Sequence, residues 1–231
     1  MIVYGRNAVR EAPAAGRRPV GRIWAAPQAA QEPWLTAREV EVVGPDEVAE
    51  RCGSLDHQGV CTEAGPYPYA DSDGLLTADD ALVVCLDQVQ DPHNLGAVCR
   101  VAEVVGCEGV VIPERRAAEV TPAACKASAG AVEHLRIAKV RNVADWLVEA
   151  KQRDAWVYGA AAGSPVRYDE PDYRGRVVLV MGSEGRGLRP RVGAACDQLV
   201  SLPVLGKVAS LNVSTAAAAI LYEILQSRRS G

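Results

Sequence analysis

Polar residues that could bind an anion or position a substrate stand together near the C-terminus, in an otherwise apolar stretch. Ser210, Asn212 and Ser214 lie between a short apolar run and a long run of alanines. They could simply accept hydrogen bonds from the free N–H groups of a helix's first turn. They could equally belong to a ligand site, because a helix N-terminus offers unpaired backbone donors and a positive dipole end. The spacing alone leaves both interpretations open.

Two other segments carry residues suited to the same chemistry. Asn94 follows the apolar run at 81–86, and Arg100 stands six residues further on, nearly two helical turns, so we expect it near the same face. Arg100 could pair with Glu103, three residues later, or bind a phosphate or a developing oxyanion. The third segment is glycine-rich and follows the apolar run at 177–181. It reads Gly182-Ser183-Glu184-Gly185-Arg186-Gly187. This pattern is neither a P-loop nor the G-x-G-x-x-G pattern of dinucleotide-binding proteins.

The elements around these segments predict an α/β domain with a doubly wound sheet. Short apolar runs alternate with helical patterns, which is typical of a parallel sheet buried on both faces. Ligands of such sheets bind at the carboxyl ends of the strands, where all three polar segments lie. We expect strands at 81–86, 109–112, 135–140, 156–160, 177–181 and 199–202, and helices at 95–105, 122–129, 143–152, 191–196 and 210–226.

A smaller α/β unit is expected ahead of this domain, at residues 1–64. Its strands are predicted near 1–4, 22–26, 40–43 and 59–63, and its helices at 7–11 and 46–51. Pro66 and Pro68 favour an extended connection. We therefore place a linker at 65–76 and the second domain at 77–231.

Composition narrows the class of protein. The 231 residues include seven cysteines without C-x-x-C spacing and only three histidines, which predicts buried thiols rather than a metal site, a disulfide framework or a cysteine nucleophile. No apolar run approaches the roughly 18 residues of a membrane span, and no secretory pattern opens the chain. We therefore expect a cytoplasmic protein that binds neither membrane nor metal.

The net charge of −4 argues against a general polyanion coat but permits local contacts. Each basic pair alone is most simply a solvated surface pair, and their recurrence on predicted loops is more suggestive than any one of them. The candidate patches are Arg17-Arg18 with Arg22, Arg115-Arg116, Arg186 with Arg189 and Arg191, and Arg228-Arg229.

In order and spacing, the three polar segments resemble the signature motifs of the SpoU, or TrmH-type, RNA ribose 2′-O-methyltransferases of the SPOUT superfamily. The residues from Val3 to Val60 are similar to the small L30e-like RNA-binding domain that precedes many members. This layout is closest to that of the bacterial 23S rRNA guanosine 2′-O-methyltransferases. The matching motifs are Asn94-Leu95-Gly96-Ala97 with Arg100, Gly182-Ser183-Glu184-Gly185 with Gly187, and Leu202-Pro203 with Ser210-Leu211-Asn212-Val213-Ser214.

The resemblance implies a fold, a cofactor and partners. The fold has a deep trefoil knot at the C-terminal end of the α/β domain, the cofactor is S-adenosylmethionine, and the partners are RNA and a second copy bound through the catalytic domain. By position, the residues that match catalytic ones are Arg100, Asn94, Glu184, Ser210 and Asn212. Those that match cofactor-binding ones are Gly182, Leu202, Leu211, Leu205, Gly206 and Met181.

The implied methyl transfer determines which role Arg100 can have. A ribose 2′-hydroxyl is a weak acid whose proton must leave as it attacks the methyl group. A guanidinium is a poor base, so we expect Arg100 to clamp a phosphate and stabilise alkoxide character, with a role as base left open. The alternatives are a tRNA or antibiotic-resistance rRNA methylase, a catalytically silent RNA-binding or ribosome-assembly factor, and a nucleotide-dependent oxidoreductase, which the missing fingerprint disfavours.

Overall fold

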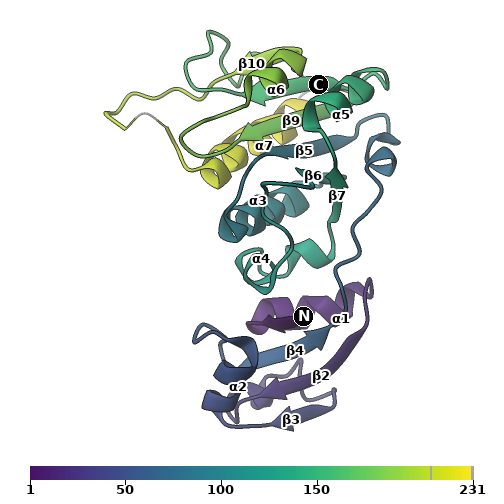
Figure 1. Cartoon of the computed structure of the whole chain (residues 1–231), viewed down its shortest axis with the longest axis vertical. Helices are drawn as coiled ribbons and strands as arrows, with labels where there is room; N and C mark the ends of the chain where they lie inside the picture. The colour runs from purple at the N-terminus through teal and green to yellow at the C-terminus, as the bar shows by residue number, and fades with distance from the viewer. Residues whose placement is uncertain (209, 230–231) are drawn as a thin grey trace.

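Two separate β-sheets organise the chain (Figure 1), which a computed structural model describes for residues 1–208 and 210–229. The sheet nearer the N-terminus has four strands in the order β1-β4-β2-β3, and the other has six in the order β10-β8-β9-β5-β6-β7. The segment that joins them runs along one side of the molecule, and the helices α1 and α4 lie between the two sheets (Figure 1).

The four-stranded sheet is mixed, since β4 pairs antiparallel with β1 and β2, whereas β3 pairs parallel with β2. Helix α1 ends at Gly16, whose left-handed φ of 64° closes the helix at little steric cost. Helix α2 begins with a proline and carries acidic residues in its first turn, as its dipole favours. The elements are β1 Ile2–Tyr4, α1 Arg6–Ala15, β2 Val20–Ala25, η1 Ala29–Gln31, β3 Val40–Val42, α2 Pro45–Cys52 and β4 Val60–Ala64.

All pairings of the six-stranded sheet are parallel, which confirms the predicted α/β class. Each strand lies within two residues of its predicted bounds. The elements are η2 Ser72–Leu76, β5 Leu82–Asp87, α3 Pro92–Val104, β6 Gly109–Pro113, α4 Pro122–Ala127, η3 Ala131–Glu133, β7 Arg136–Val140, α5 Val143–Lys151, β8 Trp156–Ala160, β9 Val177–Gly182, α6 Pro190–Ala195, β10 Gln198–Val200 and α7 Val213–Arg229.

Helices cover this sheet on both faces. On β5, Leu82, Val84 and Leu86 join the core formed with α3, α4 and α7, while Val83 and Cys85 join the core formed with α5 and α6. Side chains alternate between the faces of a strand, so a strand buried on both sides must be apolar throughout. This explains the continuous apolar runs in the sequence. No helix among the described residues is long and apolar enough to cross a membrane.

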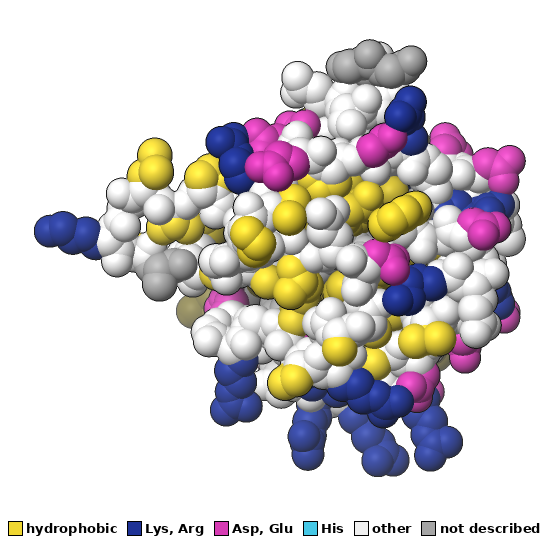
Figure 2. Space-filling view, turned by 90° about the horizontal axis from the view of Figure 1, so that it is seen from above, with side chains coloured by type: hydrophobic (Ala, Val, Ile, Leu, Met, Phe, Trp, Pro, Cys, Tyr) yellow, Lys and Arg dark blue, Asp and Glu magenta, His cyan; other side chains and the backbone are white. Residues whose placement is uncertain are grey.

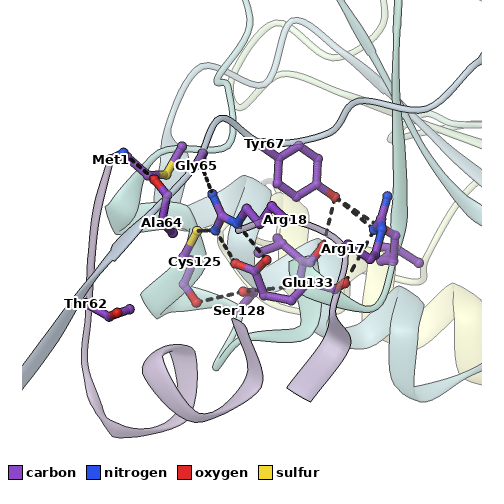
Figure 3. Close-up of polar contacts among 12 residues, drawn as sticks. Met1, Arg17, Arg18, Thr62, Ala64, Gly65, Tyr67, Cys125, Ser128 and Glu133 are labelled. Carbon is purple, nitrogen blue, oxygen red and sulfur yellow. Dashed lines mark hydrogen bonds and ion pairs between the residues drawn. The ribbon is translucent and has the colours of Figure 1, made fainter. Parts of the chain in front are cut away.

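A buried ion pair joins the two halves of the chain (Figure 3). The side chains of Arg18 and Glu133 are each 1% exposed, and Arg18 Nε donates to Glu133 Oε2 at 3.0 Å. Arg18 Nη1 also donates to the carbonyl oxygen of Gly65 at 3.0 Å. Tyr67 is buried in the same joint, with its hydroxyl 2.8 Å from the carbonyl oxygen of Val132. The pair Arg17-Arg18, which the sequence offered as a surface patch, is therefore part of an internal interface.

The connection at 65–76 is packed rather than free, because Tyr67, Leu75 and Leu76 are buried. We keep the domain limits of 1–64, 65–76 and 77–231 as a proposal. The trefoil knot also stays a prediction.

We predict that Arg18→Ala lowers the free energy of unfolding by about 3–5 kcal/mol, because it leaves the Glu133 carboxylate buried without its partner. Replacing both residues with apolar ones of similar size, Arg18→Met with Glu133→Leu, should recover most of that loss. Denaturant unfolding measures both effects. The control is Arg22→Ala, which breaks an exposed pair with Glu41 at 3.7 Å and should cost less than about 1 kcal/mol. Equal losses in Arg18→Ala and Arg22→Ala would contradict this account.

Candidate functional site

Three loops meet at the end of the six-stranded sheet where its parallel strands finish, which we call the carboxyl edge. Strands β5 and β9 are neighbours, with Asp87 paired to Gly182, so the loops that follow them start side by side. The third loop leads from β10 to α7, and α7 packs against α3. The predicted convergence of the three polar segments is therefore found in the structure.

A hydrogen-bonded cluster ties these loops together. Glu184 Oε1 accepts hydrogen bonds from Asn94 Nδ2, at 3.0 Å, and from Asn212 Nδ2. Asn212 Nδ2 also lies 3.0 Å from Asn94 Oδ1. The hydroxyl of Ser214 donates to Asn212 Oδ1 at 2.6 Å. Asn94, Glu184 and Asn212 were all proposed as site residues from the sequence, whereas Ser214 was noted at the helix entrance but not included in the site.

Asn94 lies in the first turn of α3 rather than before it. The helix begins at Pro92, three residues earlier than predicted, and Asp91 caps it by accepting from the backbone N–H of His93 at 2.9 Å. Because Asp91 takes the capping role, the Asn94 side chain is free to bind Glu184. Asn94 is only 9% exposed, so its amide depends on those partners.

The start of α7 also differs from the prediction. The helix begins at Val213, three residues later than expected, and Asn212 Oδ1 accepts from the backbone N–H of Ser214 at 2.8 Å. Asn212 therefore caps the helix, which is one of the two roles that the sequence left open, and it also binds the cluster, whereas its part in a ligand site stays a prediction. Ser210 lies in the loop before the helix, is exposed, and lines the adjoining cavity.

That cavity has a volume of about 720 Å³ and opens beside the cluster. A Cβ atom on Gly182 would lie 2.2 Å from the carbonyl carbon of Gly187, so only glycine lets the loop fold back this closely. Leu205 and Gly206 do not line the cavity, Leu205 is 98% exposed, and their assignment to a cofactor stays a prediction. The other proposed cofactor-binding residues do line it, namely Met181, Gly182, Leu202 and Leu211.

Arg100 lies away from the cluster. Six residues along an α-helix correspond to a rotation of roughly 240°, so Arg100 is exposed on another face of α3 than Asn94, contrary to our expectation. It lines a separate cavity of about 280 Å³ with Glu11 and His134. Within the described part of the chain Arg100 forms no ion pair, so the alternative pairing with Glu103 is wrong.

One anchor of the site was missed in the sequence. Asp87, at the end of β5, is fully buried and accepts from the backbone N–H of Arg189 at 2.8 Å and from its Nε at 2.7 Å. These bonds hold the end of the loop that carries Glu184. The sequence feature that could have revealed Asp87 is a carboxylate directly after the apolar run at 81–86.

The cysteines do not supply a nucleophile. Cys61, Cys85, Cys99, Cys107 and Cys125 are buried, as predicted, and Cys52 and Cys196 are half-buried. Burial raises the pKa of the Cys125 and Cys196 thiols to about 12, so both stay protonated near neutral pH.

Comparison with known proteins shows the family to which this chain belongs. Residues 81–222 match the SpoU rRNA Methylase family. This chain is a member of that family. Residues 2–70 match a second family, described as RNA 2′-O ribose methyltransferase substrate binding. The predicted resemblance to SpoU enzymes is thereby confirmed.

Relatives of this SpoU protein match it over nearly its whole length. YacO of Bacillus subtilis, named as a TrmH family tRNA/rRNA methyltransferase, is 38% identical across 98% of this chain and 95% of its own. The SpoU methyltransferase AviRb from Streptomyces viridochromogenes, solved with AdoMet, is 27% identical with a TM-score of 0.83, covering 100% of this chain and 91% of its own. A TrmH/SpoU tRNA modifying enzyme from A. aeolicus is 30% identical with a TM-score of 0.59, covering 68% of this chain and 79% of its own.

We predict that Glu184→Ala lowers the free energy of unfolding by about 1–3 kcal/mol, because the partly buried amide of Asn94 loses its acceptor. Glu184→Gln keeps a side-chain oxygen for both asparagines and should cost less than about 1 kcal/mol. Denaturant unfolding gives the energies, and amide hydrogen exchange at residues 183–188 reports whether the loop opens. Similar exchange in both variants would show that Glu184 does not hold the loop.

Proposed function

We propose that this SpoU protein methylates the 2′-hydroxyl of a ribose in RNA, with a guanosine of 23S rRNA as its substrate. That the chain is an S-adenosylmethionine-dependent RNA methyltransferase follows from its family. The observation that carries the finer proposal is the convergence of Asn94, Glu184 and Asn212 beside the large cavity. The N-terminal unit, which matches a substrate-binding family, supports a large RNA substrate in the cytoplasm.

The cavity fits S-adenosylmethionine. Its walls combine apolar side chains with Gly182, where the close approach of Gly187 leaves no room for a side chain. Met181, Gly182, Leu202 and Leu211 would hold the cofactor, and Leu205 and Gly206 are proposed to join them. Bound there, the cofactor supplies an electrophilic methyl group to a nucleophile on the adjacent RNA.

The polar residues then have separate tasks. Glu184 fixes Asn94 and Asn212 in place, so that these amides and the Ser210 hydroxyl can orient the ribose at the cavity mouth. Arg100 carries a permanent positive charge, which suits it to hold the phosphate next to the target ribose and to stabilise oxyanion character on the hydroxyl oxygen as the hydroxyl proton passes to solvent water. No group in the cluster needs to act as a strong base for this role.

Since Arg100 lies on another face of α3 than Asn94, we propose that the complete site forms in a homodimer, with Arg100 facing the partner's cluster. Exposed apolar side chains near the site support such an interface. Val104 on α3 is 60% exposed and Tyr222 on α7 is 52% exposed, and these two helices pack together. Val208 in the loop before α7 is 76% exposed.

A tRNA substrate is the second candidate. The A. aeolicus relative is named a tRNA modifying enzyme, and YacO is named for both tRNA and rRNA. Transfer of labelled methyl groups to purified tRNA and rRNA separates the two, and mapping ribose methylation in 23S rRNA from cells with and without the gene identifies the nucleotide. Transfer to neither RNA would favour a catalytically silent RNA-binding factor.

We predict that Gly182→Ala abolishes detectable S-adenosylmethionine binding in calorimetry. The added Cβ would overlap the backbone of Gly187, so the loop must shift, at a cost of about 1–3 kcal/mol in stability. Gly193→Ala is the matched control, since Gly193 also lines the cavity but nothing lies within 4 Å of an added Cβ. Normal binding by Gly182→Ala would remove the cavity as the cofactor site.

We predict that Arg100→Ala lowers methyl transfer by about 10²–10³-fold, the usual effect of removing a group that stabilises an oxyanion. Cofactor affinity should not change, because Arg100 does not line the large cavity. If the site forms across a dimer, mixing Arg100→Ala with Asn212→Ala subunits should restore part of the activity. Near-normal turnover by Arg100→Ala alone would disprove its role.

A further inference from the structure

The arginines around the six-stranded sheet differ in their partners. At the end where the strands begin, here the amino edge, most of them bind acidic side chains or carbonyl oxygens, although Arg229 forms no ion pair with any residue that the structure describes. Arg228 donates to the carbonyl oxygens of Asp80 and Gly175, just ahead of β5 and β9. The ion pairs at this edge are Arg136 with Glu108, Arg153 with Asp73, Arg174 with Asp172 and Arg176 with Asp79.

At the carboxyl edge, three arginines on two adjacent loops have no acidic partner in the described structure. Arg115 and Arg116 follow β6, and Arg141 follows β7. All three are exposed, and none takes part in an ion pair. The neighbouring acid Glu119 binds Lys139 instead, at 2.9 Å. The chain has a net charge of −4, yet within residues 1–208 and 210–229 these three cations stay without an acidic partner, as do Arg100 and Arg186.

Hydrogen bonds place this group of arginines next to the site. The backbone N–H of Glu114 donates to the carbonyl oxygen of Val140 at 2.9 Å, which brings Arg115 and Arg141 to neighbouring strand ends. The backbone N–H of Ala118 donates to the carbonyl oxygen of Val89 at 2.8 Å, so the loop after β6 is bound to the loop that leads to Asn94. Adjacent strands lie about 4.8 Å apart, and the arginines are therefore one and two strands from β5.

The two bound loops also share an unusual backbone conformation. Gln88 and Arg116 have φ angles of 60° and 59°, in the left-handed region that disfavours side chains with a Cβ. Such conformations cost about 1–3 kcal/mol each and concentrate at functional sites. Both residues lie in loops that follow strands of the sheet, Gln88 after β5 and Arg116 after β6.

We propose that Arg115, Arg116 and Arg141 bind backbone phosphates of the RNA segment that flanks the methylated nucleotide, which rests on the proposed function of the adjoining cluster. Phosphate is the anion that guanidinium groups bind best, through paired N–H donors. Seen from above, several Lys and Arg side chains gather along one side of the molecule, and others stand singly elsewhere on this face (Figure 2). A local cluster of positive charge can hold a polyanion even when the net charge of the protein is negative.

The test compares two double variants with the same net charge. Arg115→Gln with Arg141→Gln removes two arginines of the carboxyl edge and keeps Arg116, whose backbone is strained. Arg174→Gln with Arg229→Gln removes two exposed arginines at the amino edge. Binding of a fluorescein-labelled single-stranded oligouridylate is measured by anisotropy across a salt series, with thermal melting as a check on folding.

We expect the carboxyl-edge variant to bind about 25-fold more weakly at 0.1 M salt, with the slope of log affinity against log salt reduced by about 1.4, since each phosphate contact on a single strand contributes about 0.7. The amino-edge variant should bind like the wild type. Equal behaviour of the two variants would overturn the proposal. Methyl transfer by the wild type to purified rRNA and tRNA is followed in parallel. A protein that binds the oligouridylate but transfers no methyl group to either RNA would disprove the proposed function while leaving this comparison decisive.

Discussion

The site depends on one carboxylate, which accepts hydrogen bonds from two side-chain amides in distant parts of the sequence. Glu184 accepts from Asn94 and Asn212, which are separated from it by 90 and 28 positions in the sequence. Both amides lie at helix N-termini, so the positive ends of the α3 and α7 dipoles point toward the negative charge. The cavity walls around Gly182 and Leu211 belong to the same loops. The shape of the cavity and the position of the polar groups are therefore set by the same few bonds.

A second constraint fixes the substrate-binding unit to the sheet. The core on one face of the sheet extends through α4 to Val3 and Ala8, and the Arg18–Glu133 pair closes the joint. Arg100 lies beside this joint, since its cavity is lined by Glu11 from the N-terminal unit and by His134, whose Nε2 is 3.0 Å from Glu11 Oε2. Any tilt of the N-terminal unit would thus alter the surroundings of Arg100 directly.

The sequence predicted the fold class because a parallel sheet buried on both faces demands continuous apolar runs, and it predicted the three-loop site because polar residues at strand ends have few other reasons to recur. It failed at local details of the helices and at contacts far along the chain. Helix α3 begins at Pro92 instead of residue 95, because Asp91 caps it, and Arg18 became internal because Glu133, 115 positions away, neutralises it. The face of Arg100 was mistaken because six residues do not complete two turns of a helix.

Contacts between residues distant in the sequence also limit the prediction of a nucleic-acid-binding surface from basic residues. Arg186, Arg189 and Arg191 look equivalent in the sequence, yet Arg189 is bound by the buried Asp87 and Arg191 by Asp145, while Arg186 has no ion pair in the described structure. A cation already matched by a carboxylate gains little from a phosphate, because it must first give up that partner. What distinguishes a binding surface in an acidic protein is therefore which arginines the fold leaves unmatched. That property appears only once the whole chain has been placed.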